Sequence, residues 1–124
     1  MARLILTPGQ TFKWVRSAEV TEIIGTNENE TVFVGEDARA VFDSSFNRGG
    51  DVIHIEGAAA LYAVSLKGSN VEITSEAGAS IFIPVGTAGT AVNFADLETM
   101  LRIDGAAVKL GAVDVTATPG PVIG

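Results

Sequence analysis

The sequence predicts an all-β domain of many short strands, arranged as a β-sandwich or as a β-solenoid or roll, with at most one short helical turn. Apolar and polar residues alternate with a period of two, β-branched residues dominate these segments, and turn residues interrupt them at short intervals. Only 6% of the residues are aromatic and 14 are glycine, so we expect small side chains packed in thin layers.

The predicted strands follow one another with Gly, Asn, Ser and Asp in the links between them. In chain order they span residues 3–6, 11–15, 20–24, 31–34, 39–42, 52–55, 61–66, 70–74, 80–83, 91–94, 99–103, 107–110 and 113–116. The link 67–70 predicts a tight hairpin, and residues 61–83 predict a three-strand meander.

One segment also fits a helical turn. Asn93 is a suitable cap, and Phe94, Leu97 and Leu101 follow helical spacing. Because Leu101 also belongs to an alternating pattern, we expect a single helical turn followed by a strand.

Two segments of the chain resemble each other. Residues 30–36 and 50–57 each contain an acid, then an apolar strand, then glycine with glutamate. Two copies do not define a repeat family, but they indicate stacked coils in the middle third of the chain.

The length of 124 residues predicts one β domain over 1–116 and an extended tail over 117–124 that packs poorly on its own domain. Both ends of the chain are apolar and strand-like. An extended terminal strand can add to the sheet edge of a neighbour. The predicted assembly residues are therefore Leu4, Ile5, Leu6, Val122 and Ile123.

Charge and composition restrict the partners. The formal net charge of −7, without a basic cluster, argues against nucleic acid and anionic membrane surfaces. The absence of cysteine excludes disulfides and thiolate metal sites. No apolar run reaches the length of a membrane span or of a signal-peptide core, so we expect no membrane insertion and any export without a cleaved N-terminal signal.

Catalytic chemistry has little support in the sequence. His54 is the only histidine, and it lies in a predicted strand without a neighbouring nucleophile motif. No phosphate-binding glycine loop or hydrolase motif occurs. We therefore expect no enzyme, no catalytic residues and no cofactor-binding residues. Trp14 and Tyr62 are expected to anchor a core or an interface.

The loop 43–51 is the one candidate metal site. Asp43, Asn47 and Asp51 supply oxygen ligands of the kind Ca²⁺ prefers, around a glycine-rich turn. Arg48 would weaken cation binding, and the spacing matches neither an EF-hand nor a calcium-binding nonapeptide repeat. The alternative is a solvated turn capped by its aspartates.

An ordered set of motifs between Val41 and Leu110 resembles a known kind of module. The motifs are Phe42-Asp43-Ser44-Ser45-Phe46-Asn47-Arg48-Gly49-Gly50-Asp51-Val52-Ile53, Gly68-Ser69-Asn70-Val71, Ile83-Pro84-Val85-Gly86-Thr87-Ala88-Gly89-Thr90, Phe94-Ala95-Asp96 and Val108-Lys109-Leu110-Gly111. This order resembles a β-rich module of large bacterial surface proteins of the RTX and S-layer-like kind, exported by type I secretion. The resemblance implies an extracellular location and a structural or adhesive role, without a catalytic site.

The leading hypothesis is a self-assembling extracellular structural protein, a subunit of a bacterial surface filament, layer or matrix that binds copies of itself. The first alternative is an adhesion module that binds calcium or a glycan, and the second is a virion decoration or tail component.

Overall fold

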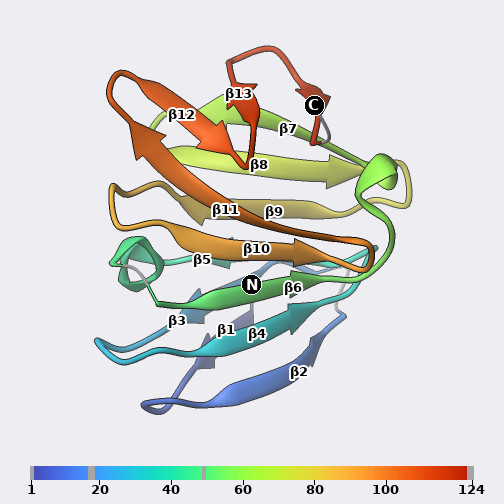
Figure 1. The fold of residues 1–124 in the computed structure, drawn as a ribbon. Helices are drawn as coiled ribbons and strands as arrows, with labels where there is room; N and C mark the ends of the chain where they lie inside the picture. Colours follow the sequence, from blue (N-terminus) through green and yellow to red (C-terminus); the bar gives the residue numbers. More distant parts are fainter. Residues whose placement is uncertain (1, 17–18, 49, 123–124) are drawn as a thin grey trace.

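The computed structural model describes residues 2–16, 19–48 and 50–122 and confirms the all-β class. Two seven-stranded sheets face each other (Figure 1). The first sheet has the order β1 (Ala2–Ile5), β3 (Thr21–Ile24), β5 (Arg39–Phe42), β9 (Ser80–Pro84), β8 (Asn70–Ser75), β7 (Tyr62–Lys67) and β14 (Gly120–Pro121). The second has the order β13 (Val113–Val115), β12 (Ala107–Leu110), β11 (Leu97–Asp104), β10 (Thr90–Phe94), β6 (Val52–Ile55), β4 (Thr31–Val34) and β2 (Thr11–Val15).

The first part of the chain winds between the two sheets as a stack of coils. Each coil places one strand in each sheet: coil 1 is β1 and β2, coil 2 is β3 and β4, coil 3 is β5 and β6, and coil 4 is β9 and β10. Successive coils pair in parallel in both sheets. Thr31 lies opposite Val52 and Val34 opposite Ile55, so the two similar segments do stack as neighbouring coils.

The second part of the chain is antiparallel. The hairpin β7–β8 closes between Lys67 and Asn70, as the turn sequence predicted, and β9 completes the meander. Gly68 has φ +64°, a conformation that glycine adopts at low cost. Strands β11, β12 and β13 extend the second sheet in the same antiparallel manner.

The core lies between the sheets and follows the period-2 alternation. In coils 2 and 3, Ile23, Val32 and Ile53 are fully buried, while their sequence neighbours lie on the outer faces. Each such side chain contributes about 1.5–3 kcal/mol of burial free energy. The rings of Phe42 and Phe46 are buried in this core and meet edge-to-face, with their centroids 4.7 Å apart.

The predicted helical turn after Asn93 is wrong. Phe94 lies opposite Leu97 at the end of the β10–β11 hairpin, and β11 pairs with β12 on its other side. The strand form wins because both neighbours supply backbone partners and Leu101 becomes buried. Short 3₁₀ helices occur instead at Ser44–Asn47 and Ala59–Leu61, which are too short to have a detectable periodicity.

The C-terminal tail is exposed over residues 117–119, but its last described residues pack on the domain. Gly120 and Pro121 pair with Val64 and Ala63 of β7, and the Val122 side chain is only 3% exposed. Within the described part of the chain, no helix has the length and apolar character that crossing a membrane requires.

Candidate functional site

A row of polar residues precedes the parallel strands of the second sheet. Gln10, Glu30 and Asp51 stand immediately before β2, β4 and β6, and Thr90 is the first residue of β10. Backbone hydrogen bonds keep this row in register, since each of the first three carbonyls accepts an N–H from the following coil, at 3.0, 3.0 and 3.2 Å. Equivalent positions of successive coils therefore lie next to one another.

The side chains of this row join each coil to the one before it. In coil 2, Glu30 accepts the Gly9 N–H of coil 1 at 3.1 Å. In coil 3, Asp51 Oδ1 accepts the Glu30 N–H at 2.8 Å. In coil 4, Thr90 Oγ1 donates to the Phe46 carbonyl at 2.5 Å.

Coil 1 departs from this rule. The Gln10 Oε1 atom accepts the Thr7 N–H at 2.9 Å, so the side chain bonds within its own turn. The side chains at these equivalent positions thus bond to the preceding coil in coils 2 to 4, but to their own turn in coil 1.

Burial and hydrogen bonding act in opposite directions on the two acids of the row. Glu30 is 1% and Asp51 2% exposed. Burial alone would raise the pKa of Glu30, but hydrogen bonds from the backbone and hydroxyl of Thr26 and from Gly9 lower it below its usual value. Burial raises the pKa of Asp51, and the charges of Glu30 and Asp43 add to this effect.

Acids at the opposite edge of the stack make similar links. Glu56 in coil 3 accepts the Glu36 N–H at 3.2 Å and forms a bidentate pair with Arg16 at 2.8 and 2.9 Å. The hydrogen bond from Arg16 is the main cause that lowers the pKa of Glu56. Asp96 Oδ1, after coil 4, accepts the Ala59 N–H at 2.9 Å.

Tyr62 packs against this second edge. Its buried hydroxyl donates to the Glu56 carbonyl. Burial raises its pKa to about 12, with further contributions from the charges of Glu36, Glu56 and Asp37. Tyr62 is thus a core anchor, as expected from its sequence.

The candidate calcium ligands do not converge on a cation site among the described residues. Asp43 Oδ1 accepts hydrogen bonds from Gly25 N at 3.4 Å, Ser45 N at 3.1 Å and the Ser45 hydroxyl. Asp51 is bonded to Glu30, and the Asn47 carbonyl packs so closely on Gly86 that a Cβ there would lie 2.2 Å away. No group of three or more His, Asp or Glu side chains in the described ranges could hold a metal ion. This geometry favours the capped-turn interpretation of the loop.

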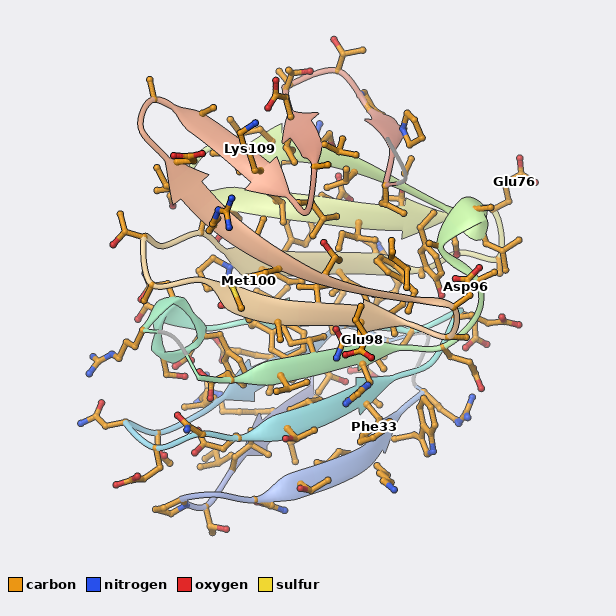
Figure 2. All side chains as sticks on the ribbon, viewed as in Figure 1. Phe33, Glu76, Asp96, Glu98, Met100 and Lys109 are labelled. Carbon is orange, nitrogen blue, oxygen red and sulfur yellow. The ribbon has the colours of Figure 1, made fainter. Side chains whose placement is uncertain are left out.

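His54 belongs to an aromatic row on the outer face of the second sheet. Lys13, Phe33, His54, Asn93 and Glu98 occupy one register across five strands. Figure 2 shows Phe33 and Glu98 projecting from this face. The Phe33 and His54 rings stack at 4.3 Å, and Trp14 meets Phe33 edge-on at 5.1 Å. The three rings thus pack against one another. They come from different coils, so the local sequence does not predict that they meet.

The predicted assembly residues have different environments. Leu6 and Val122 are buried at 3% exposure, so they belong to the core of this chain and cannot be surface contacts in this fold. Leu4 is partly buried against the core, whereas Ile5 is 67% exposed. Ile123 lies outside the described residues.

Ile5 is part of an open end of the stack. Strands β1 and β2 are the last strands of their sheets, at the same end, and no other described strand pairs with their outer edges (Figure 1). Ala2 N and Leu6 N bond to β3 and the residues beside it. Because alternate residues of a parallel strand face the same neighbour, the N–H groups of Arg3 and Ile5 face away from the stack.

These features define a class: a two-sheet β protein with a parallel coil stack and an antiparallel continuation, in which the first described coil has no described strand on its outer side. No protein-family profile, curated protein or solved structure matches the chain.

Proposed function

We propose that this chain is a structural subunit that joins its neighbours through strand edges in an extracellular bacterial assembly. The observation that carries the proposal is the open end, where two adjacent sheets both finish on a strand that no other described strand pairs on its outer side. Unpaired strand edges are templates for pairing with another chain. The extracellular placement rests on the resemblance to type I-secreted surface modules.

The side chains around the open end support the same role. Natural proteins usually protect sheet edges with very short strands, proline or charges. β1 and β2 have four and five residues and contain no proline, and only β2 has a register shift, between Lys13 and Val15. Arg3 and Arg16, which could guard the edge, form ion pairs with Glu22 at 3.0 Å and Glu56 at 2.8 Å in later coils.

The links between coils suit a building block that must hold its shape. Glu30 and Asp51 tie three consecutive coils together inside the fold, where loss of one partner would leave a buried polar group unsatisfied. A rigid end loses little conformational entropy when it docks.

The test is assembly of the purified full chain, followed by negative-stain microscopy and sedimentation velocity across protein, salt and calcium concentrations. We expect oligomers in the parent and monomers in Ile5→Pro, which removes an outward N–H without touching the β1–β3 bonds. Ile5→Thr is the matched control, because it changes the exposed side chain but keeps the N–H, and it should assemble.

Far-ultraviolet circular dichroism checks that each variant is folded. Thr11→Pro, on β2, is a second edge variant if Ile5→Pro unfolds the chain. Monomers of the parent under every condition would contradict the proposal.

A further inference from the structure

The two ends of the stack differ in how open they are. At the C-terminal end, the outermost strands are β13, with three residues, and β14, with two residues including Pro121. The Leu66 N–H of β7 also donates to the Thr116 carbonyl, at 2.7 Å, beyond the end of β13. Short strands and proline are the usual protection of a sheet edge. No described strand pairs with the outer edges of β13 and β14 either, but these protections make that end the less accessible one, and we call it the closed end. We call the N-terminal end open; its β2 has one register shift, between Lys13 and Val15, and neither β1 nor β2 contains proline.

The polar row shows that coil 1 is not built to follow another parallel coil. In coils 2, 3 and 4 the residue at the start of the second-sheet strand bonds to the preceding coil. The equivalent residue of coil 1, Gln10, is already bonded to Thr7 in its own turn. At the other edge, the position equivalent to Glu56 is Arg16, which bonds forward to coil 3. An additional parallel coil stacked on the outer side of coil 1 would lack the side-chain link that coils 2, 3 and 4 each make through the polar row.

Apolar side chains line the open end. Leu4 and Phe12 point inward but are only partly buried, because no coil covers them on the outer side in the described structure. Ile5, the next residue of β1, points to the opposite, outer face of the first sheet and is largely exposed. The end thus offers both hydrogen-bonding edges and apolar surface to a partner.

The charges of coil 1 do not prevent two such ends from meeting. Arg3 and Arg16 are neutralised by Glu22 and Glu56, and the Lys13 ammonium lies 4.8 Å from the centre of the Phe33 ring on the outer face. All three basic side chains thus contact later coils, and the Arg3 side chain is 64% exposed on β1.

We propose that the partner of the open end is the open end of a second copy, joined with two-fold symmetry and antiparallel pairing of the edge strands. This inference rests on the proposed assembly function and specifies its geometry. The described structure has one open end, so pairing of two such ends gives a closed dimer and not a growing filament. A head-to-tail contact would instead need the protected β13–β14 end.

The size of the end indicates the class of interface that it can form. Strands of about five residues in sheets about 10 Å apart give a contact of less than about 1,200 Å² in total, the range of weak interfaces. We therefore expect a weak, reversible dimer that dissociates on dilution.

Sedimentation velocity over about 1 to 200 µM tests the stoichiometry of the full chain. The expected result is a monomer–dimer equilibrium that stops at the dimer. The double variant Ile5→Pro with Thr11→Pro should raise the Kd of the dimer at least about tenfold, which corresponds to the loss of roughly one strong contact. The control Ile5→Thr should change the Kd little.

Spin-label distances test the symmetry, and the absence of native cysteine allows single labels. Ile5→Cys marks the open end and Ala117→Cys the closed end. Seven strands per sheet span about 29 Å. A two-fold dimer should therefore give a short distance from position 5 and about 60 Å from position 117.

Other outcomes separate the failure of the two-fold geometry from that of the proposed function. Head-to-tail contact would give about 35 Å from both labels and polymers that grow with concentration, which overturns the two-fold geometry but keeps the assembly function. A parent chain that stays monomeric up to the highest concentration overturns both the two-fold geometry and the proposed assembly function.

Discussion

Glu30→Ala should destabilise the fold strongly although the side chain lies in a turn. The carboxylate of Glu30 accepts three hydrogen bonds: from Gly9 N at 3.1 Å, Thr26 N at 2.7 Å and the Thr26 hydroxyl at 2.8 Å. The side chain is 1% exposed, so these bonds form away from water. Its removal takes away the side-chain link between coils 1 and 2 at this edge, where the backbone bond from Thr31 N to the Gln10 carbonyl remains, and leaves the three donors without their acceptor.

The expected loss of stability follows from the three hydrogen bonds that the Glu30 carboxylate accepts. A hydrogen bond to a charged group contributes about 1.5–3 kcal/mol, and three of them set an upper range. Two effects reduce the loss. Gly9 lies on an exposed turn where water can replace the carboxylate, and removal of the charge relieves its repulsion of Asp51. We expect a net decrease of about 2–4 kcal/mol in the free energy of unfolding, or about 10 °C in Tm.

Urea unfolding at neutral pH, followed by circular dichroism at one low protein concentration, measures this change. Glu28→Ala is the matched control, since Glu28 is an exposed acid of the same turn, and it should change stability by less than about 0.5 kcal/mol.

The difference should also depend on pH with a defined sign. Because the folded-state pKa of Glu30 is lowered, its stabilisation is present above the unfolded value of 4.5 and is lost as pH falls through the folded pKa. Equal stability of Glu30→Ala and Glu28→Ala at neutral pH, or an effect of Glu30→Ala that grows in acid, would refute this role of the Glu30 carboxylate.

Three further changes test other parts of the structure. Asp51→Asn keeps an oxygen for the Glu30 N–H but removes a buried charge whose pKa is raised. Because the folded-state pKa of Asp51 is raised, the parent loses stability as pH rises through that pKa and Asp51 ionises. The variant should therefore be at least as stable as the parent at neutral pH, and any advantage of the variant should disappear in acid. A decrease of more than about 1 kcal/mol in the free energy of unfolding of the variant at neutral pH, measured in urea, would contradict this. Tyr62, the only tyrosine, should show no phenolate absorbance until about pH 12 while the chain is folded, and ionisation near the ordinary value of 10.0 would show that its hydroxyl is not buried. Val122→Ala should lower stability by about 1–2 kcal/mol without changing the sedimentation behaviour, and an unchanged melting curve would refute its place in the core.

The strands could be predicted from sequence because their signal is local. β2, β4, β5, β6 and β12 begin and end at the predicted residues. Alternation and flanking turn residues decide strand bounds within a few positions of the chain. Segment 93–101 was the exception, because helical and strand spacing coincide in it and only pairing with neighbours on both sides decides between them.

The candidate site was harder to predict than the strands. The loop 43–51 was identified as a polar turn with aspartate caps as one of its two interpretations, and Asp43 does cap the 3₁₀ helix that follows it. That Asp51 bonds to Glu30, and Glu30 to Gly9, depends on which turns stack. These partners lie about 20 positions apart, and the only sequence signal was the similarity of 30–36 to 50–57.

By itself the sequence determined the all-β class, most strand bounds and the likeness of the two middle coils, since each follows from side chains within one strand or turn. Only the tertiary structure decided that the coils pair in parallel, that Val122 returns to the core and that β1 and β2 are the outermost described strands of their sheets. The physical reason is that strand pairing uses backbone groups that nearly every residue carries, so its order depends on how the whole core closes.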